Sequence, residues 1–206
     1  MPIALQSLIF PFANLIIQSS INSTGSNNIA AWALCGKLDF LVFLIADSIA
    51  GAIATYVAQN HGAKKEIRIK KGIKAGLVIS TVPIICLSIL LFLFCGSLAK
   101  IFIRPSDYDV IPSIINIIRF ISPFYFFYST AELFSGVMKG KGKTFMAMII
   151  SIFSACVIRI FWIAFIDTMN NHSILLILAC YPISWFVSIL LYTTFDRVPQ
   201  KEKIQD

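Results

Sequence analysis

The sequence predicts an all-helical membrane protein, a bundle of six transmembrane helices, from three observations on composition and pattern. Hydrophobic residues fill 58% of the 206 positions and charged residues 13%, about half the charged share of an average soluble domain. The apolar residues form six continuous blocks of about 20 residues or more, the length that a helix needs to cross a bilayer. The blocks do not alternate with a period of two, which disfavours a transmembrane β-barrel. These observations exclude an ordinary soluble domain.

The six blocks define the expected spans and leave no room for a separate soluble domain within 1–195. They cover approximately residues 2–22, 29–60, 73–98, 111–138, 145–166 and 173–194. As one helix the second block would be about 48 Å long, so it must tilt, break or begin with a turn outside the membrane. Residues 196–206 are expected to form a charged cytoplasmic tail.

The positions of the basic residues predict the orientation of the chain in the membrane. Most of them follow the second, fourth and sixth spans: Lys64, Lys65, Arg68, Lys70, Lys71, Lys74, Lys139, Lys141, Lys143, Arg197, Lys201 and Lys203. Because positive residues stay on the cytoplasmic side during insertion, both termini are expected in the cytoplasm, in a plasma or inner membrane. A lipid-headgroup site at 64–74 is an alternative reading of the largest cluster, but topology alone explains it. The first residues lack the features of a cleaved signal peptide.

Signals of a soluble enzyme or a metal protein are weak. The five cysteines stand singly in apolar runs, and His61 and His172 are expected in loops on opposite sides of the membrane. The run from Lys139 to Thr144 looks like a phosphate-binding loop, but Val137 stands where that motif needs a glycine. We therefore expect neither an enzyme nor a resident cofactor or metal, and no nucleic-acid partner, because the lysines lie between apolar runs.

Amide side chains in the first span predict a polar stripe. Asn14, Gln18 and Asn22 recur every four residues, and Gln6 precedes them. Such a stripe faces a neighbouring helix or a watery cavity, because amides against lipid would lack hydrogen-bond partners. Contacts between helices are worth only about 0.6 kcal/mol each in membranes, so we favour cavity lining. The fourth span repeats the theme on one face, with Tyr125, Tyr128, Ser129 and Glu132.

Charged residues inside the spans need a reason, because each costs about 3 kcal/mol near the middle of the bilayer. Asp39 is expected either to pair with Arg119 or Arg159 as a structural contact or to serve function, and both alternatives stay open. Asp47 and Glu132 are the best candidates for carboxyl groups that load and release a proton, while amide oxygens could coordinate Na⁺. The alternative is that the amides join helices and that Glu132 reaches the cytoplasmic interface.

Several stretches, in order along the chain, resemble the C-terminal six-helix lobe of the multidrug and toxic compound extrusion (MATE) transporters. In the first half they are PIALQS at 2–7, INSTG at 21–25, IAA at 29–31, KLD at 37–39 and VAQNHGA at 57–63, followed by Arg68. In the second half they are SPFY at 122–125, GKGKT at 140–144, Arg159 and YPISW at 181–185. The likeness extends across nearly the whole chain.

The resemblance implies one lobe of a two-lobe antiporter that exports organic cations or drugs in exchange for Na⁺ or H⁺. It implies the lipid bilayer as surroundings and a six-helix N-terminal lobe as partner, so we expect a truncated or split product that is inactive alone. Half of a lipid-linked oligosaccharide flippase and a non-transporting membrane scaffold remain as alternatives. Some members carry a carboxylate in the first span where this chain has Phe10. Glu132 is on the helix that carries the partner carboxylate in those members, but about one turn from that position.

Overall fold

The computed structural model describes residues 2–169 and 173–196, with side chains described from residue 9 onward. Every element of regular structure in this part of the chain is helical. The α-helices are α1 (Pro2–Asn22), α2 (Ser26–Gly62), α3 (Glu66–Phe102), α4 (Ile111–Ile121), α5 (Tyr125–Gly140), α6 (Thr144–Ile152), α7 (Ile158–Thr168), α8 (Ile174–Leu178) and α9 (Cys180–Asp196). Short 3₁₀ stretches precede α4 and α5, at Pro105–Val110 and Ser122–Phe124. A π-helical stretch, Phe153–Val157, joins α6 to α7.

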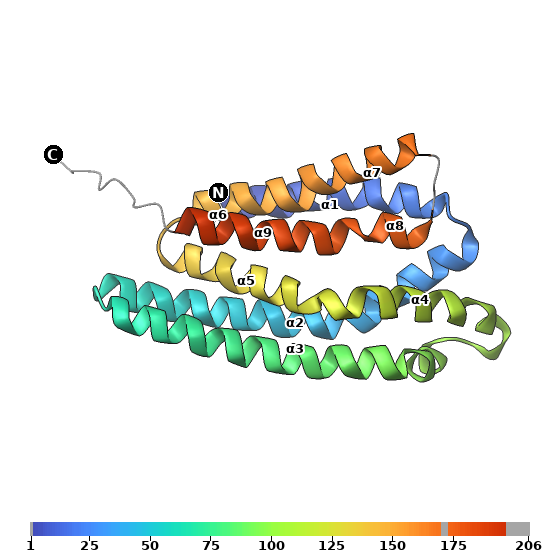
Figure 1. The fold of residues 1–206 in the computed structure, drawn as a ribbon, viewed down its shortest axis with the longest axis horizontal. Coiled ribbons are helices and arrows are strands. Elements are labelled where there is room, and N and C mark those ends of the chain that lie inside the picture. The colour runs from blue at the N-terminus through green and yellow to red at the C-terminus, as the bar shows by residue number, and fades with distance from the viewer. Residues whose placement is uncertain (1, 170–172, 197–206) are drawn as a thin grey trace.

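Within the described residues, five helical segments are long and apolar enough to cross a membrane (Figure 1). They are Ser26–Gly62, Glu66–Phe102, Pro105–Gly140, Thr144–Thr168 and Ile174–Asp196, which match the second to sixth predicted spans. The first predicted span coincides with α1, a helix of 21 residues that lies alongside α6 and α7 (Figure 1). Because α1 is not one of the five, its crossing of the membrane stays a prediction.

The helices α2 and α3 are longer than the sequence predicted. Each is one continuous helix of 37 residues, about 55 Å long, against about 30 Å of hydrocarbon. Their paired ends project beyond α5 and α9 in Figure 1. The expected basic loop is therefore mostly helix, since Arg68, Lys70, Lys71 and Lys74 lie in the first turns of α3. Lysine and arginine favour helices, so helical structure continues where the apolar run stops.

The last three segments contain interruptions that hydropathy does not reveal. Pro123 lies in the 3₁₀ turn between α4 and α5, and the π-helical stretch interrupts the segment Thr144–Thr168. The segment Ile174–Asp196 breaks at Ala179, because Pro182 has no N–H to donate to the carbonyl of Leu178. Two of these interruptions border a cavity, and the change in backbone geometry there determines how the lining side chains point.

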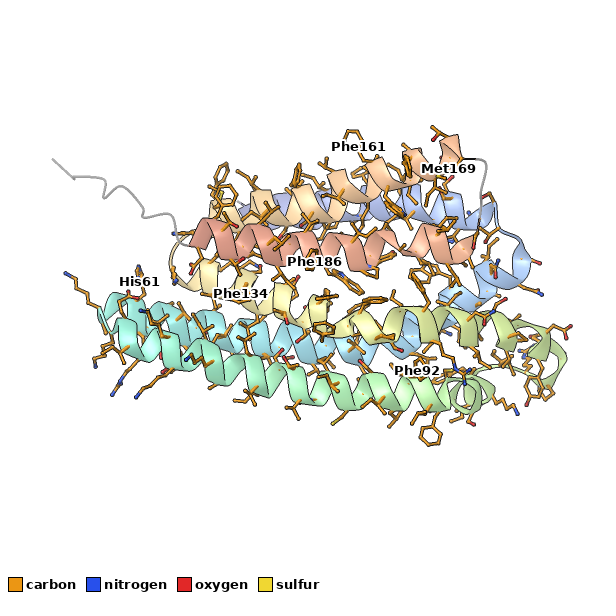
Figure 2. All side chains as sticks on the ribbon, viewed as in Figure 1. His61, Phe92, Phe134, Phe161, Met169 and Phe186 are labelled. Atoms are coloured by element: carbon orange, nitrogen blue, oxygen red, sulfur yellow. The ribbon has the colours of Figure 1, made fainter. Side chains whose placement is uncertain are left out.

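The outer surface of the helices is apolar. Phe161 and Met169 lie on the outward side of α7 in Figure 2, with 72% and 61% of their surface exposed. The interior holds a large apolar cluster to which α1–α5 and α7–α9 contribute, and in which Tyr125 and Ile118 are fully buried. Large apolar side chains outside and a packed apolar core within are the arrangement that a lipid environment requires.

One end of the molecule carries the basic turns. The α2–α3 turn, with His61 beside it, and the α5–α6 turn lie at this end (Figures 1 and 2). Lys141 of the α5–α6 turn forms an ion pair of 2.7 Å with Asp196, the last described residue of α9. The expected tail residues Arg197, Lys201 and Lys203 lie outside the described residues. The basic clusters at 64–74 and 139–143 thus share one side, as the orientation argument requires.

Candidate functional site

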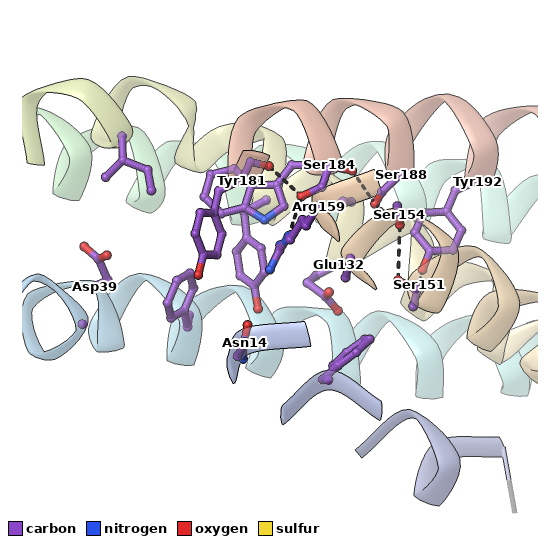
Figure 3. Close-up of a pocket in the computed structure, with 18 of the residues that line it drawn as sticks. Asn14, Asp39, Glu132, Ser151, Ser154, Arg159, Tyr181, Ser184, Ser188 and Tyr192 are labelled. Atoms are coloured by element: carbon purple, nitrogen blue, oxygen red, sulfur yellow. Dashed lines mark hydrogen bonds between the residues drawn. The ribbon is translucent and has the colours of Figure 1, made fainter. Parts of the chain in front are cut away.

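A cavity of about 320 Å³ opens between α1, α2, α5, α9 and the α6–α7 segment (Figure 3). Its aromatic lining comes mainly from Trp32, Phe43, Tyr128, Tyr181 and Trp185. Its polar lining includes one amide, two carboxyl groups and one guanidinium: Asn14, Asp39, Glu132 and Arg159. Concave sites with mostly apolar walls and a few convergent polar groups are typical of small-molecule binding.

The wall between α2 and α5 is built from tyrosine–aspartate hydrogen bonds. Tyr125 donates from its hydroxyl to Asp39, and both side chains are buried. One turn further along α5, Tyr128 donates to Asp47 at 2.9 Å. Positions 125, 128 and 132 share one face of a helix, so Glu132 follows the two tyrosines toward the cavity. The expected polar face of this helix is present with one exception, because Ser129 faces α3 and forms a hydrogen bond with Ser80.

The expected ion pair of Asp39 with an arginine is wrong. Among the described side chains, neither Arg119 nor Arg159 forms an ion pair with Asp39, which is satisfied by Tyr125 instead. Arg119 donates from Nε to the carbonyl of Phe92 at 3.4 Å and lies over the Phe92 ring. Two desolvated charges are costly to bury together, whereas one phenol satisfies a carboxyl group without a second charge.

Arg159 lies on the opposite wall, where two residues of α9 hold it. Its Nε donates to Ser184 Oγ at 2.9 Å, and its guanidinium carbon lies 4.3 Å from the centre of the Tyr181 ring. Ser184 donates in turn to the carbonyl of Tyr181 at 2.8 Å. Arg159 is therefore a positioned cation facing the cavity and not half of the expected structural pair.

The same wall contains a hydrogen-bonded row of hydroxyl groups that sequence reasoning missed. Ser188 donates to Ser154 Oγ at 2.7 Å, and Ser151 shares a bond of 2.6 Å with the Tyr192 hydroxyl. Together with Ser184, the α9 members of this row recur every fourth residue, so they lie on one face of the helix. The four-residue spacing of these hydroxyl residues in an otherwise apolar segment is the sequence feature that could have predicted the row.

The amides of α1 divide between two environments. Asn14 lines the cavity, whereas Gln18 and Asn22 do not and instead bond each other at 2.9 Å. A four-residue step turns about 40° around the helix axis, so two steps carry Asn22 about 80° away from Asn14. The predicted single cavity-lining stripe is therefore wrong for Gln18 and Asn22. Gln6 lies in α1, and its side chain lies outside the described residues.

The two candidate carboxyl groups also differ in place. Asp47 is exposed, bonded to Tyr128, and does not line the cavity. Glu132 lines the cavity, and its carboxyl group makes no hydrogen bond or ion pair within 9–169 and 173–196. In the same residues no three His, Cys, Asp or Glu side chains gather into a metal site. Glu132 is thus the cavity carboxyl group that has no protein partner there.

Comparisons with known proteins agree on one family. A family model described as MatE matches residues 2–165. "Probable multidrug resistance protein YoeA" of Bacillus subtilis is 24% identical over 204 residues, which cover 98% of this chain and 44% of the relative. "Probable multidrug resistance protein NorM" of Thermotoga maritima is 27% identical over 163 residues, which cover 77% of this chain and 34% of the relative. The chain therefore spans less than half the length of these curated relatives.

Solved structures share the arrangement of the helices. An outward-facing multidrug resistance MATE family transporter of the MOP superfamily superposes with a TM-score of 0.84 at 15% identity, over 96% of this chain and 43% of that chain. A MOP superfamily transporter from Pyrococcus furiosus, whose binding pocket is described as having reverse polarity, gives a TM-score of 0.83 at 15% identity, with the same coverage. At such identities the likeness establishes the fold.

Proposed function

This chain belongs to the MatE family, and from that premise we propose that it forms one lobe of a multidrug-type efflux transporter whose cargo enters the cavity. The cargo is an organic cation or drug, exchanged for Na⁺ or H⁺. The relatives named as multidrug resistance proteins support export of the cargo, and the cavity supplies a place where cargo and ion can be exchanged.

The proposal rests mainly on one observation: the carboxyl group of Glu132 lines the cavity and has no direct partner among the described residues. A carboxylate in a cavity within the membrane needs a balancing charge, and no described side chain provides one by direct contact. An organic cation can balance it while its rings pack against Trp32 and Trp185, and a proton or Na⁺ can balance it in turn. Because the two cannot occupy Glu132 together, binding of one releases the other, which is the exchange that an antiporter needs.

A second lobe completes the transporter in this proposal. Alternating access requires two units that rock against each other around a central site, and this chain supplies one. The curated relatives are more than twice as long as the matched region, which supports a second six-helix lobe on the same or another polypeptide. With α1 as a sixth span, the basic end would face the cytoplasm from a plasma or inner membrane.

Reconstitution into liposomes tests this function. We expect the 206-residue chain to insert but not to transport, and the chain fused to the N-terminal lobe of the Bacillus relative to drive ion-dependent efflux of a cationic dye. Glu132→Gln in the fusion should lower the rate at least tenfold, whereas Asp109→Asn, an exposed carboxyl group outside the cavity, should leave it unchanged.

Two results would contradict the proposal. Dye efflux by the chain alone would show that a second lobe is not needed. A fusion that is folded and inserted but moves no dye under any ion gradient would favour a non-transporting scaffold or a flippase for another cargo.

A further inference from the structure

We propose that Arg159 forms a carboxylate-binding subsite in the cavity, so that the preferred cargo is a small aromatic zwitterion rather than a simple cation. The proposal rests on the proposed function, since it names the cargo class of the same cavity. The side chains of Arg159, Glu132 and Asn14 approach the same space in Figure 3. The subsite is the edge of the guanidinium group formed by its two terminal nitrogens, which no acceptor of the described residues occupies.

The attachment of Arg159 leaves its terminal nitrogens available. The bond from Nε to Ser184 and the stacking on Tyr181 fix one edge and one face of the guanidinium plane. The two terminal amino groups make no hydrogen bond or ion pair to the described residues. A planar fork of this kind binds a carboxylate through two parallel hydrogen bonds, and its fixed geometry lowers the entropy that binding costs.

Among the described residues, no carboxyl group forms an ion pair with Arg159. Guanidinium groups stay protonated, and a charge within the membrane is retained where it has a partner or a function. Asp39 is already bonded by Tyr125, and Glu132 lines the cavity without forming an ion pair with Arg159. A cargo with only positive charge would meet a like charge at this wall. A cargo carboxylate would meet two free donors.

The cavity also limits the rest of the cargo. Glu132 offers the opposite charge for an amine, and the aromatic side chains of Trp32, Tyr128 and Trp185 line the walls around it. A volume of about 320 Å³ is enough for a single substituted ring. The arrangement therefore selects an amine and a carboxylate at opposite ends of one aromatic group.

A matched set of probes tests the subsite in the purified full chain. The probes are 4-(aminomethyl)benzoate, its methyl ester and benzylamine, which share the ring and the amine and differ in the carboxylate. We expect the acid to bind at least tenfold tighter than the ester, as measured by isothermal titration or saturation-transfer NMR. Arg159→Gln should remove this preference, and Arg159→Lys, which keeps the charge without the planar fork, should retain a smaller one.

Arg119→Gln is the matched control. Arg119 also donates from Nε to an acceptor and lies over an aromatic ring, but it does not line the cavity. It should leave the preference for the acid unchanged. The wild-type ratio of acid to ester binding decides the question even if Arg159→Gln does not fold.

Three outcomes would overturn the inference, and they separate it from the proposed function. Equal binding of acid and ester to the wild-type chain would show that Arg159 forms no carboxylate subsite, and the proposed cation site at Glu132 would still stand. A preference for the acid that survives in folded Arg159→Gln would place the carboxylate elsewhere. Binding of none of the three probes by a folded chain would count against the cargo cavity itself.

Discussion

The contact between α2 and α5 has two halves built on different principles. In the half beside the cavity, Tyr125 and Tyr128 reach across to carboxyl groups of α2. In the half toward the basic end, Gly136 and Gly140 lie against the backbone carbonyl groups of Ala50 and Ala54. The same two helices are therefore joined through side-chain hydrogen bonds at one end and by direct backbone packing at the other.

The difference explains where the cavity is located. Glycines let two helix backbones approach closely, and this close approach is a common way to hold membrane helices together. Side chains as long as tyrosine hold the backbones apart and leave room beside their hydroxyl groups. The packed half can thus act as the fixed support of the lobe, and the polar half as its binding region.

The packed half should be the more sensitive to substitution. In Gly136→Val the added Cβ would meet the carbonyl oxygen of Ala50, a backbone atom that cannot move aside, so we expect a loss of about 3 kcal/mol in unfolding free energy. Unfolding in mixed detergent micelles, followed by circular dichroism, measures it. Gly51→Val on α2 is the control, because no neighbouring atom lies within 4 Å of its added Cβ. Equal losses in both variants would refute close packing at Gly136.

In the polar half, the two tyrosine–aspartate bonds should contribute unequally to the free energy of unfolding. Tyr125→Phe leaves the buried Asp39 without its hydrogen-bond partner and should cost about 2 kcal/mol, whereas Tyr128→Phe affects the exposed Asp47 and should cost less than about 1 kcal/mol. The same unfolding measurement applies. Asp39→Asn keeps an acceptor for Tyr125 and should cost less than Tyr125→Phe, and the reverse order would contradict this role of the bond.

Much of the fold could be predicted because hydropathy and helix length determine it. The apolar blocks located the helices, and the fourth predicted span of 111–138 agrees closely with the end of α5 at Gly140. The edges of the apolar blocks did not predict the ends of α2 and α3, since helix propensity continues beyond the apolar residues. The interruption at Phe153–Val157 was also missed, because a π-helical turn depends on packing and not on composition.

The site was less predictable, because it depends on how the helices are rotated against each other. The sequence indicated Asn14 and Glu132 as cavity residues but could not show that a tyrosine would satisfy Asp39. Nor could it show that Ser184 and Tyr181 would hold Arg159. Partners from helices far apart in the sequence are determined by crossing geometry, which hydropathy does not encode.

Filling the cavity should affect binding and leave the fold intact. Gly36 lines the cavity, and an added Cβ there meets no atom within 4 Å. We expect Gly36→Leu to change unfolding free energy by less than about 0.5 kcal/mol, while the methyl ester of 4-(aminomethyl)benzoate binds at least tenfold more weakly. The Gly51→Val protein serves again as the control for binding. Unchanged ester binding in Gly36→Leu would place the ligand outside this cavity.

If water and cargo reach the polar half of the lobe, chemical labelling of α1 should reveal it. In a variant with its five cysteines replaced, Asn14→Cys and Leu15→Cys are treated in membranes with a water-soluble maleimide. The two positions are neighbours on α1, but Asn14 lines the cavity, whereas Leu15 is 65% exposed on the outer surface. We expect Asn14→Cys to react at least tenfold faster than Leu15→Cys, and bound ligand to slow the reaction of Asn14→Cys. Equal rates at the two positions would contradict a water-accessible cavity.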